Sequence, residues 1–380
     1  MDIIGTLILF VPMLVVLWLA NRSHRHRIEG DLRNERTFKL LAYGLLVLLY
    51  AGLLAFGLLF VGLGAALVAA PELAGGFDAE AMGIGLDRLP WLGASLAVLS
   101  LVGMILLTRP ARRLFSRFTP IDPSHPVHAV ALSFTALILV NLAATVAVGL
   151  DNLADMLQST AEAGVANNPA PALWAQNITF LVMGLIGVGW LARRGLKTAL
   201  LRLGIVAPTV RQALAGLGLG VLMVPLVLVA EIVAGKLGLG TSAEVERLTE
   251  QLVGPLTLSI PGILTLGLAA ALGEETVFRG ALQPRFGLVF TTLLFALLHS
   301  QYGFSFSTVA VFVVGLVLGL VRLRTNTTTA MIVSILLGAG RDPSYVVGGI
   351  VAGLDSNAHA GAEPLFVIEA DEYDRTFLSL

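Results

Sequence analysis

"LGLAAALGEETVFRGALQPR", residues Leu266–Arg285, places ionisable side chains at the end of a nearly unbroken apolar run. Glu274 and Glu275 are adjacent, and Arg279 follows four residues after the second glutamate. The apolar run is typical of a membrane-spanning helix, which needs about 20 residues. A charge at the bilayer centre costs about 2.5–3.5 kcal/mol on insertion scales, so such groups persist where they face a hydrated cavity lined by protein. The stretch is therefore a candidate functional site inside a membrane helix.

The rest of the chain has the same apolar character. Of 380 residues, 56% are hydrophobic and 13% are charged, and the mean hydropathy is +0.87. A soluble domain has about 25% charged residues. We therefore predict an all-α polytopic membrane protein with about 8–10 transmembrane helices. An outer-membrane barrel would show short alternating segments instead. The chain has no cysteine, which excludes disulfides and thiolate metal sites.

Apolar stretches separated by polar loops define the predicted spans. They fall at residues 3–20, 40–70, 91–107, 127–149, 173–192, 213–234, 256–283, 286–300 and 306–323. The first has no basic region before it and no small-residue cleavage site, so it reads as a retained helix and not as a signal peptide. The acidic segment 151–166 is predicted to form a short interfacial helix.

The loops alternate in charge. Loops 21–39, 108–126 and 193–212 are rich in lysine and arginine, whereas the loops between them are acidic. Because Lys/Arg-rich loops stay in the cytoplasm, we expect a multi-pass protein of the plasma membrane with its N-terminus outside.

The three charges of the opening stretch separate into a pair and a single group. Glu275 and Arg279 are four residues apart, so on a helix they share one face and can form an ion pair. Glu274 points about 100° away from Glu275. One carboxylate can thus be held in a structural ion pair while the other stays free. A free carboxylate in a site of low dielectric constant suits a general base.

The next span supplies a possible partner. In "FTTLLFALLHSQ", residues 290–301, Phe295 and His299 are four residues apart. A neutral imidazole can position water, donate to an oxyanion or bind a metal. The same residues also fit a structural interpretation, with Glu275–Arg279 as an ion pair at a helix end and His299 as a core histidine. Their occurrence together on consecutive spans favours a site.

These residues resemble a known family. "EETVFRG" followed by "FALLH" is similar to the first two signatures, EExxxR and FxxxH, of the CAAX prenyl protease and bacteriocin-processing (CPBP, or Abi) family of intramembrane endopeptidases. The resemblance covers about residues 210–333 and implies a glutamate-activated water that attacks a peptide bond. By this analogy Glu274 is the general base, Glu275 and Arg279 shape the site, and His299 holds the water or the oxyanion. Bacterial members are often described as metalloproteases, but the sequence has no HExxH and no clear set of three ligands. A divalent metal therefore stays an open alternative.

The third signature of that family, His-x-x-x-Asn, is absent. It should follow "LVLGLVRLRTNTTTAMIV", where this chain has Ser334 and Gly338 in place of the histidine and the asparagine. Serine cannot replace imidazole as a base or as a cation that stabilises an oxyanion. If the position matters as the family implies, we expect activity to be strongly reduced.

The segment from Thr327 to the end resembles a second family. "TTTAMI", "DPSYVVGG" and "EADEYDRTFL" are similar to motifs of the ATP-binding central domain of Mur ligases, closest to UDP-N-acetylmuramate–alanine ligase. That resemblance implies short strands and a magnesium-holding carboxylate drawn from Glu369, Asp371 and Glu372. A P-loop needs glycines and a lysine around the phosphates, and "RLRTN" before Thr327 has neither. About 40 residues also rarely bury a stable core alone, so ligase activity is not expected.

The chain is therefore interpreted as a chimera that joins the two families at about Thr327–Val333. We expect N-terminal transmembrane helices at 1–209, a protease core at 210–333, and an incomplete α/β-like ligase fragment at 334–380. Gene fusion, recombination and assembly error explain the junction equally well, and the alternative is a divergent protease with an unrelated tail.

The predicted function is an intramembrane endopeptidase, intact or disabled by the missing third signature. Its expected partners are the lipid bilayer and a membrane-associated peptide, with no nucleic acid. A non-catalytic membrane scaffold or immunity-type protein of the same fold is the main alternative. A small-solute transporter is disfavoured because no internal repeat is found. The scattered polar residues Glu231, Asn141 and Asn177 are better explained as interhelical hydrogen-bond partners.

Overall fold

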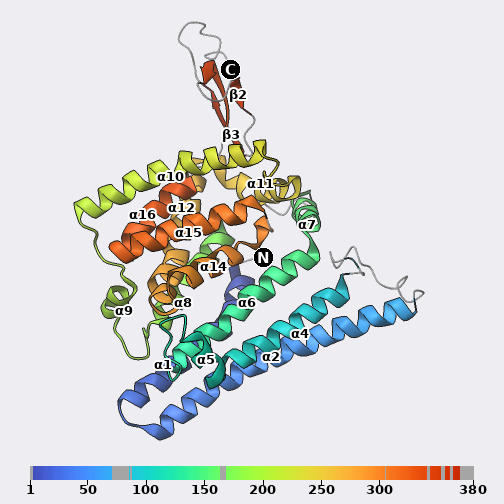
Figure 1. Ribbon diagram of the computed structural model, residues 1–380. Coiled ribbons are helices and arrows are strands. Elements are labelled where there is room, and N and C mark those ends of the chain that lie inside the picture. The colour runs from blue at the N-terminus through green and yellow to red at the C-terminus, as the bar shows by residue number, and fades with distance from the viewer. Residues whose placement is uncertain are drawn as a thin grey trace.

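Long apolar helices make up most of the computed structural model, which describes residues 3–70, 85, 88–162, 168–303, 305–339, 343–351, 356–359 and 363–368 (Figure 1). The long helices are α1 (Ile3–Ile28), α2 (Leu32–Ala69), α4 (Leu89–Leu106), α6 (Pro126–Val148), α8 (Ala170–Gly187), α10 (Val210–Lys236), α12 (Ile260–Glu275) and α15 (Phe306–Arg324). Within the described residues, seven helical segments are long and apolar enough to cross a membrane, and α14 (Leu288–Leu298) and α16 (Thr327–Ala339) are shorter apolar helices. The all-α polytopic membrane fold is thus confirmed.

Short helices connect and cap the long ones. They are α5 (Arg109–Phe115), α7 (Leu150–Glu162), α9 (Leu196–Leu203), α11 (Ala243–Thr257), α13 (Gln283–Phe286) and the 3-10 turn η3 (Ser300–Tyr302). The predicted interfacial helix corresponds to α7, while 163–166 lie outside the described residues. Helix α11 was not predicted, because its polar composition hides an apolar face on which Val245 and Leu248 are buried.

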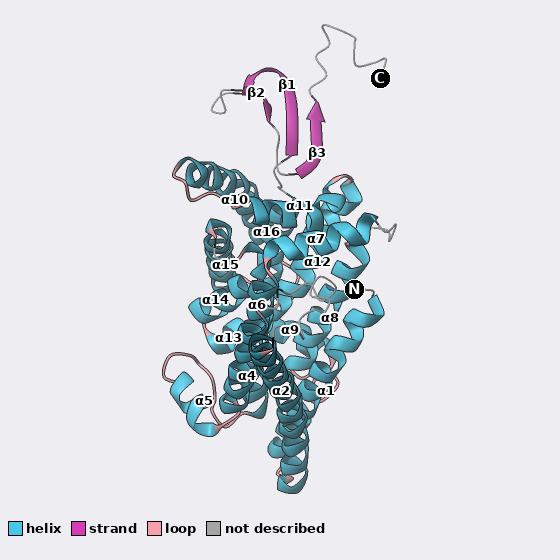
Figure 2. Ribbon diagram, turned by 90° about the vertical axis from the view of Figure 1, so that its right-hand side faces the viewer, coloured by secondary structure: helices cyan, strands magenta, loops and turns pink. Residues whose placement is uncertain are grey.

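The C-terminal segment contains strands, as its resemblance implies. Strands β1 (Pro343–Val351), β2 (Ser356–His359) and β3 (Glu363–Ile368) form a sheet in the order β2-β1-β3. β1 pairs antiparallel with β2 and parallel with β3. The strands project from one end of the helical body, where β3 lies against α11 (Figure 2). Glu369, Asp371 and Glu372 lie outside the described residues.

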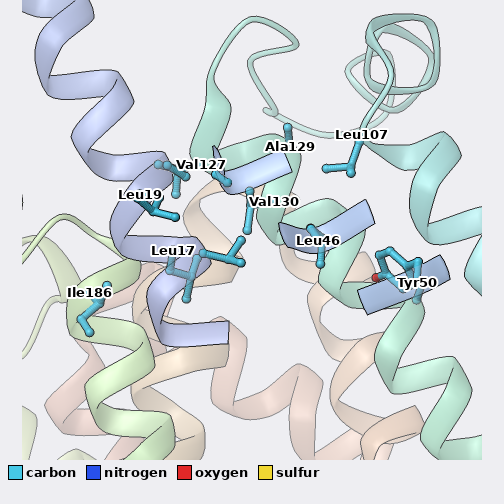
Figure 3. Close-up of a cluster of buried hydrophobic side chains, with 13 residues drawn as sticks. Leu17, Leu19, Leu46, Tyr50, Leu107, Val127, Ala129, Val130 and Ile186 are labelled. Atoms are coloured by element: carbon cyan, nitrogen blue, oxygen red, sulfur yellow. The ribbon is translucent and has the colours of Figure 1, made fainter. Parts of the chain in front are cut away.

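The largest buried cluster holds the N-terminal helices together. Leu17 and Leu19 of α1, Leu46 and Tyr50 of α2, and the first turns of α6 meet there (Figure 3). Tyr50 is fully buried and its hydroxyl donates to the backbone oxygen of Ser133 at 2.6 Å. A phenol inside an apolar cluster needs such a partner, so this bond fixes α2 against α6.

Glycines allow the closest helix contact in this part. A Cβ on Gly57 of α2 would lie 2.6 Å from the backbone oxygen of Gly93 on α4, and a Cβ on Gly93 would lie 2.7 Å from the backbone nitrogen of Val61. No side chain fits at these distances. Small residues are the usual means of close helix approach in membranes, so these two positions explain how α2 and α4 lie side by side (Figure 1).

Loops that were predicted to share one side of the membrane contact one another. Arg27 Nη1 donates to the backbone oxygen of Ser124 at 3.0 Å, which joins loops 21–39 and 108–126. Arg25 Nη1 donates to the backbone oxygen of Ala192 at 3.2 Å, which joins the first loop to the α8–α9 turn. Two acidic segments meet separately, where Arg247 of α11 pairs with Asp155 of α7 at 2.5 Å. Among the described residues, the basic loops therefore contact one another, and the acidic helices α7 and α11 pair separately.

Candidate active site

The site is built on helix α12 and the segment that follows it. Ser259 begins the helix because its hydroxyl accepts from the backbone N–H of Gly262 at 3.1 Å. Directly after Glu275 the chain widens into a π-helix, η2 (Thr276–Leu282). π-helical turns are rare and are frequently found at functional sites. The widening occurs between the two residues of the predicted ion pair.

Glu275 and Arg279 form the ion pair that their spacing predicts. Arg279 Nη1 lies 3.0 Å from Glu275 Oε1, and the two side chains are 2% and 1% exposed. Arg279 Nη2 also donates to the backbone oxygen of Gly315 on α15 at 3.3 Å. The guanidinium carbon lies 4.2 Å from the centre of the Phe295 ring, a cation–π contact. Arg279 thus ties α12, α14 and α15 together.

Glu274 has a different environment from its neighbour. Its side chain is 17% exposed, and its Oε2 lies 3.9 Å from Nε2 of His299, which is 19% exposed. The structure therefore brings the two predicted reactive groups together and leaves both accessible. At 3.9 Å the atoms are too far apart for a direct hydrogen bond, and a gap of this size between polar atoms is one that a bridging water suits.

The hydrogen bond at the other ring nitrogen sets the state of His299. Nδ1 lies 2.8 Å from the backbone oxygen of Phe295. A carbonyl oxygen only accepts, so Nδ1 carries the hydrogen. In the neutral imidazole Nε2 is then an acceptor, as is the carboxylate of Glu274. Two acceptors that face each other can share the two hydrogens of one water molecule.

A polar cluster from the N-terminal helices supports the turn after His299. Asn141 Nδ2 on α6 donates to Ser300 Oγ at 3.0 Å, and Thr145 Oγ1 lies 2.9 Å from the same oxygen. Asn141 is therefore an interhelical partner, as predicted. Sequence reasoning missed Ser300 and Thr145 as supports of the site, because isolated hydroxyl residues in apolar spans carry no spacing signal.

Helix α8 forms the wall beside the glutamates. A Cβ on Gly273 would lie 2.6 Å from the backbone oxygen of Asn177, so α8 touches the α12 backbone next to Glu274. Asn177 is 1% exposed, and its amide donates to Leu173 in its own helix. Its Oδ1 has no hydrogen-bond partner among the described residues. The interhelical bond predicted for Asn177 is therefore wrong: the close approach permitted by Gly273 gives it a packing contact instead.

Helix α16 carries the position of the missing third signature. A Cβ on Gly338 would lie 2.7 Å from the Cα of Gly267 on α12. At the other end of α16, Thr327 Oγ1 donates to Leu203 at 2.6 Å, and Leu203 also packs against Gly280 of η2. The two helices therefore run in opposite directions. Gly267 also lies against Ile335, the residue that follows Ser334, so Ser334 belongs to the segment of α16 that packs on α12.

The side chains do not fit a metal of the usual catalytic kind. Among the described residues, no three His, Cys, Asp or Glu side chains are grouped closely enough to hold one. Glu274 and His299 offer two ligands, whereas Glu275 is engaged by Arg279. Catalytic zinc sites have three protein ligands, so these two side chains do not make up such a site.

A family model matches the part of the chain that holds these residues. Residues 256–337 match the family model of the type II CAAX prenyl endopeptidases, Rce1-like. The matched part contains both glutamates, Arg279, His299 and Ser334. At the level of the family, the Rce1-like segment supports an intramembrane protease.

A second, shorter likeness is to cell-wall ligases. The chain is 58% identical over 53 residues to the UDP-N-acetylmuramate–L-alanine ligase of Clavibacter michiganensis, which is 14% of this chain and 11% of the ligase. It is 56% identical over 55 residues to that of Myxococcus xanthus, again 14% of this chain and 12% of the ligase. The chain thus spans about a tenth of the length of these curated relatives. No solved structure matches the chain. Two unrelated likenesses in one chain agree with the chimeric interpretation.

Proposed function

We propose that the Rce1-like segment is an intramembrane endopeptidase site in which Glu274 and His299 activate one water molecule. The observation that carries this proposal is the 3.9 Å separation of Glu274 Oε2 and His299 Nε2, with both side chains partly accessible. The neighbouring Glu275–Arg279 pair is buried and already engaged. Glu274 is therefore the carboxylate free to take a proton.

The hydrolysis follows from the two acceptors. Water held between them donates one hydrogen to Glu274 and the other to Nε2 of His299, which aims its oxygen at a bound peptide carbonyl. As the oxygen attacks the carbonyl carbon, Glu274 takes the proton. The tetrahedral intermediate then breaks its C–N bond, and Glu274 returns the proton to the leaving amine. The products are a carboxylic acid and an amine, and the acid then passes the remaining water proton to the amine, which leaves a carboxylate and an ammonium group.

The step that this site supports least is stabilisation of the oxyanion, the negative charge that develops on the peptide carbonyl oxygen. His299 presents an acceptor at Nε2, so it does not stabilise a developing negative charge while it is neutral. In the resembled family the third signature would contribute a histidine and an asparagine, whereas here the positions hold Ser334 and Gly338. Loss of one oxyanion donor costs about 10²–10³ in kcat. We therefore propose that turnover is slow.

The test uses purified protein in proteoliposomes with a panel of membrane-anchored peptides, both prenylated and unprenylated, analysed by mass spectrometry for new termini. Ser334→His should raise cleavage, and Glu274→Gln in that variant should abolish it. Gly338→Asn is not added, because its Cβ would meet the α12 backbone at Gly267. Cleavage that survives Glu274→Gln would refute the proposed base.

A non-catalytic scaffold is the second candidate function. The backbone contact between Gly338 and Gly267 favours it, because this packing leaves no room for the asparagine of the family signature. For a scaffold, neither the wild type nor Ser334→His cleaves any peptide of the panel. The same fold would then serve only to bind a membrane partner.

Sidedness and the junction complete the proposal. We propose a plasma-membrane protein with its N-terminus outside, supported by the positive-inside rule and by the contacts among the three basic loops. In the variant Glu29→Cys, a membrane-impermeant thiol reagent should label the cysteine only from the cytoplasmic side.

We also propose a protease core at 210–333 followed by a ligase-like fragment at 334–380. One uninterrupted sequencing read of source DNA across codons 320–345 would refute an assembly error if it contained this junction.

A further inference from the structure

A group of cations lies away from the candidate active site, where the basic loops meet. Three histidines, His24 of α1 and His125 and His128 at the start of α6, stack in a row. Their ring centres are 3.9 Å and 4.2 Å apart. Arg193, Arg194 and Arg285 contribute positive charge to this row. We call these six residues the imidazole–arginine cluster.

The hydrogen bonds of the histidines leave donors available. Nδ1 of His125 accepts from the backbone N–H of Val127 at 3.2 Å, and Nδ1 of His128 accepts from that of Asp122 at 3.0 Å. A neutral ring that accepts at Nδ1 carries its hydrogen on Nε2. Nδ1 of His24 is buried and has no hydrogen-bond partner among the described residues. The row therefore offers N–H donors and one unused ring nitrogen.

The positive charge of the cluster is poorly balanced. Burial and then the charges of Arg193, Arg27 and Arg194 lower the pKa of His24 to about 4. Burial, followed by the charges of neighbouring arginines, also lowers the pKa of Arg193 to about 10. Asp122 is the carboxylate that opposes these charges at His24, and its Oδ1 already accepts from the backbone N–H and the hydroxyl of Ser124. An anion would relieve this repulsion.

A strained turn presents the two central arginines. Leu191 has φ 61°, the one positive value at a non-glycine residue in the described part of the chain. Backbone N–H groups of Arg193 and Arg194 both donate to Gly189, each at 2.9 Å, which closes the turn. Left-handed backbone at a bulky residue is strained and tends to occur at ligand sites. The Leu191 side chain is 60% exposed beside these charges.

The position of the cluster at the ends of apolar spans indicates its ligand. One apolar span begins at Pro126, next to His125, and two others finish at Gly187 and Phe286, within six residues of Arg193 and next to Arg285. The group therefore lies where a bilayer changes from hydrocarbon to headgroups, with the exposed Leu191 beside it. Basic pockets between transmembrane helices on the cytoplasmic side bind lipid head groups. We propose that the imidazole–arginine cluster binds the phosphate of an anionic phospholipid headgroup.

The test is a lipid titration of the purified, delipidated full chain, followed by native mass spectrometry. Phosphatidylglycerol should bind more tightly than phosphatidylcholine. Each arginine near an anionic lipid is worth about a fivefold change in affinity, so Arg193→Gln/Arg285→Gln should weaken phosphatidylglycerol binding roughly 25-fold. The matched control is Arg113→Gln/Arg117→Gln, which removes the same charge from two exposed arginines that are not members of the cluster.

The outcomes distinguish a phospholipid headgroup from a free phosphate ion as the ligand. Selective loss of phosphatidylglycerol binding in the cluster variant supports the proposal, and equal loss in the control variant overturns it. If inorganic phosphate competes at millimolar concentration, the ligand is a free anion and the lipid assignment is wrong. Arg193 Nε donates to Asn21, so the double variant can disturb folding. Arg285→Gln alone, with about a fivefold expected effect, then carries the test, because the Arg285 side chain is exposed and its loss leaves the packing of the cluster in place.

Discussion

Removing the guanidinium of Arg279 should strongly destabilise the protein. Arg279→Met deletes the 3.0 Å ion pair with Glu275, the 3.3 Å hydrogen bond to Gly315 and the cation–π contact with Phe295. Glu275 is fully buried, and apart from the ion pair of Oε1 with Arg279 its carboxylate has no partner among the described residues. Breaking a buried pair by deleting one partner costs about 3–5 kcal/mol. We therefore expect a loss of that size.

A double-mutant cycle separates the pair from simple packing. Glu275→Gln/Arg279→Met removes both charges, so its stability should return to within about 2 kcal/mol of the wild type. The assay is reversible unfolding by sodium dodecyl sulfate in mixed micelles, followed by far-ultraviolet circular dichroism. Arg113→Met, at an exposed arginine, is the control and should cost little. Additive losses from the two single changes would refute the reasoning that the charges stabilise each other.

Three further changes test other parts of the structure. Gly338→Asn should cost about 1–3 kcal/mol in the same titration, because its Cβ would lie 2.7 Å from Gly267 Cα; unchanged stability would contradict this packing. His299→Ala should cost only about 1 kcal/mol of stability but lower Glu274-dependent cleavage roughly 100-fold or more, as peptide mass spectrometry would measure. Arg247→Gln should cost at most about 1 kcal/mol, because the Arg247–Asp155 pair is solvent-exposed, and about 1 M salt should erase the difference.

The ion pair and the membrane fold were predictable because both follow from short-range regularities. Hydropathy locates long apolar helices, and helical periodicity brings Glu275 to Arg279. The predicted second span, 40–70, corresponds to a helix that begins earlier, at Leu32, and ends at Ala69, because the charged residues at its start continue the helix without extending the apolar run. The amphipathic helix α11 was not predicted from hydropathy, because its many polar residues keep it from resembling an apolar span.

The details of the candidate site depend on tertiary contacts that no spacing encodes. The tautomer of His299 is set by its bond to Phe295, and the support of Ser300 comes from Asn141, which is remote in sequence. The π-helix after Glu275 has no composition signal that distinguishes it from an α-helix. The close contact of Gly338 with α12 likewise appears only when both helices are in place.

The most direct test of the Glu274–His299 site is the rate of peptide cleavage by Ser334→His in proteoliposomes, measured with and without Glu274→Gln. We predict cleavage above the wild-type rate in the single variant, and at least a 100-fold loss when Glu274→Gln is added. Equal cleavage by the two proteins would contradict the assignment of Glu274 as the base.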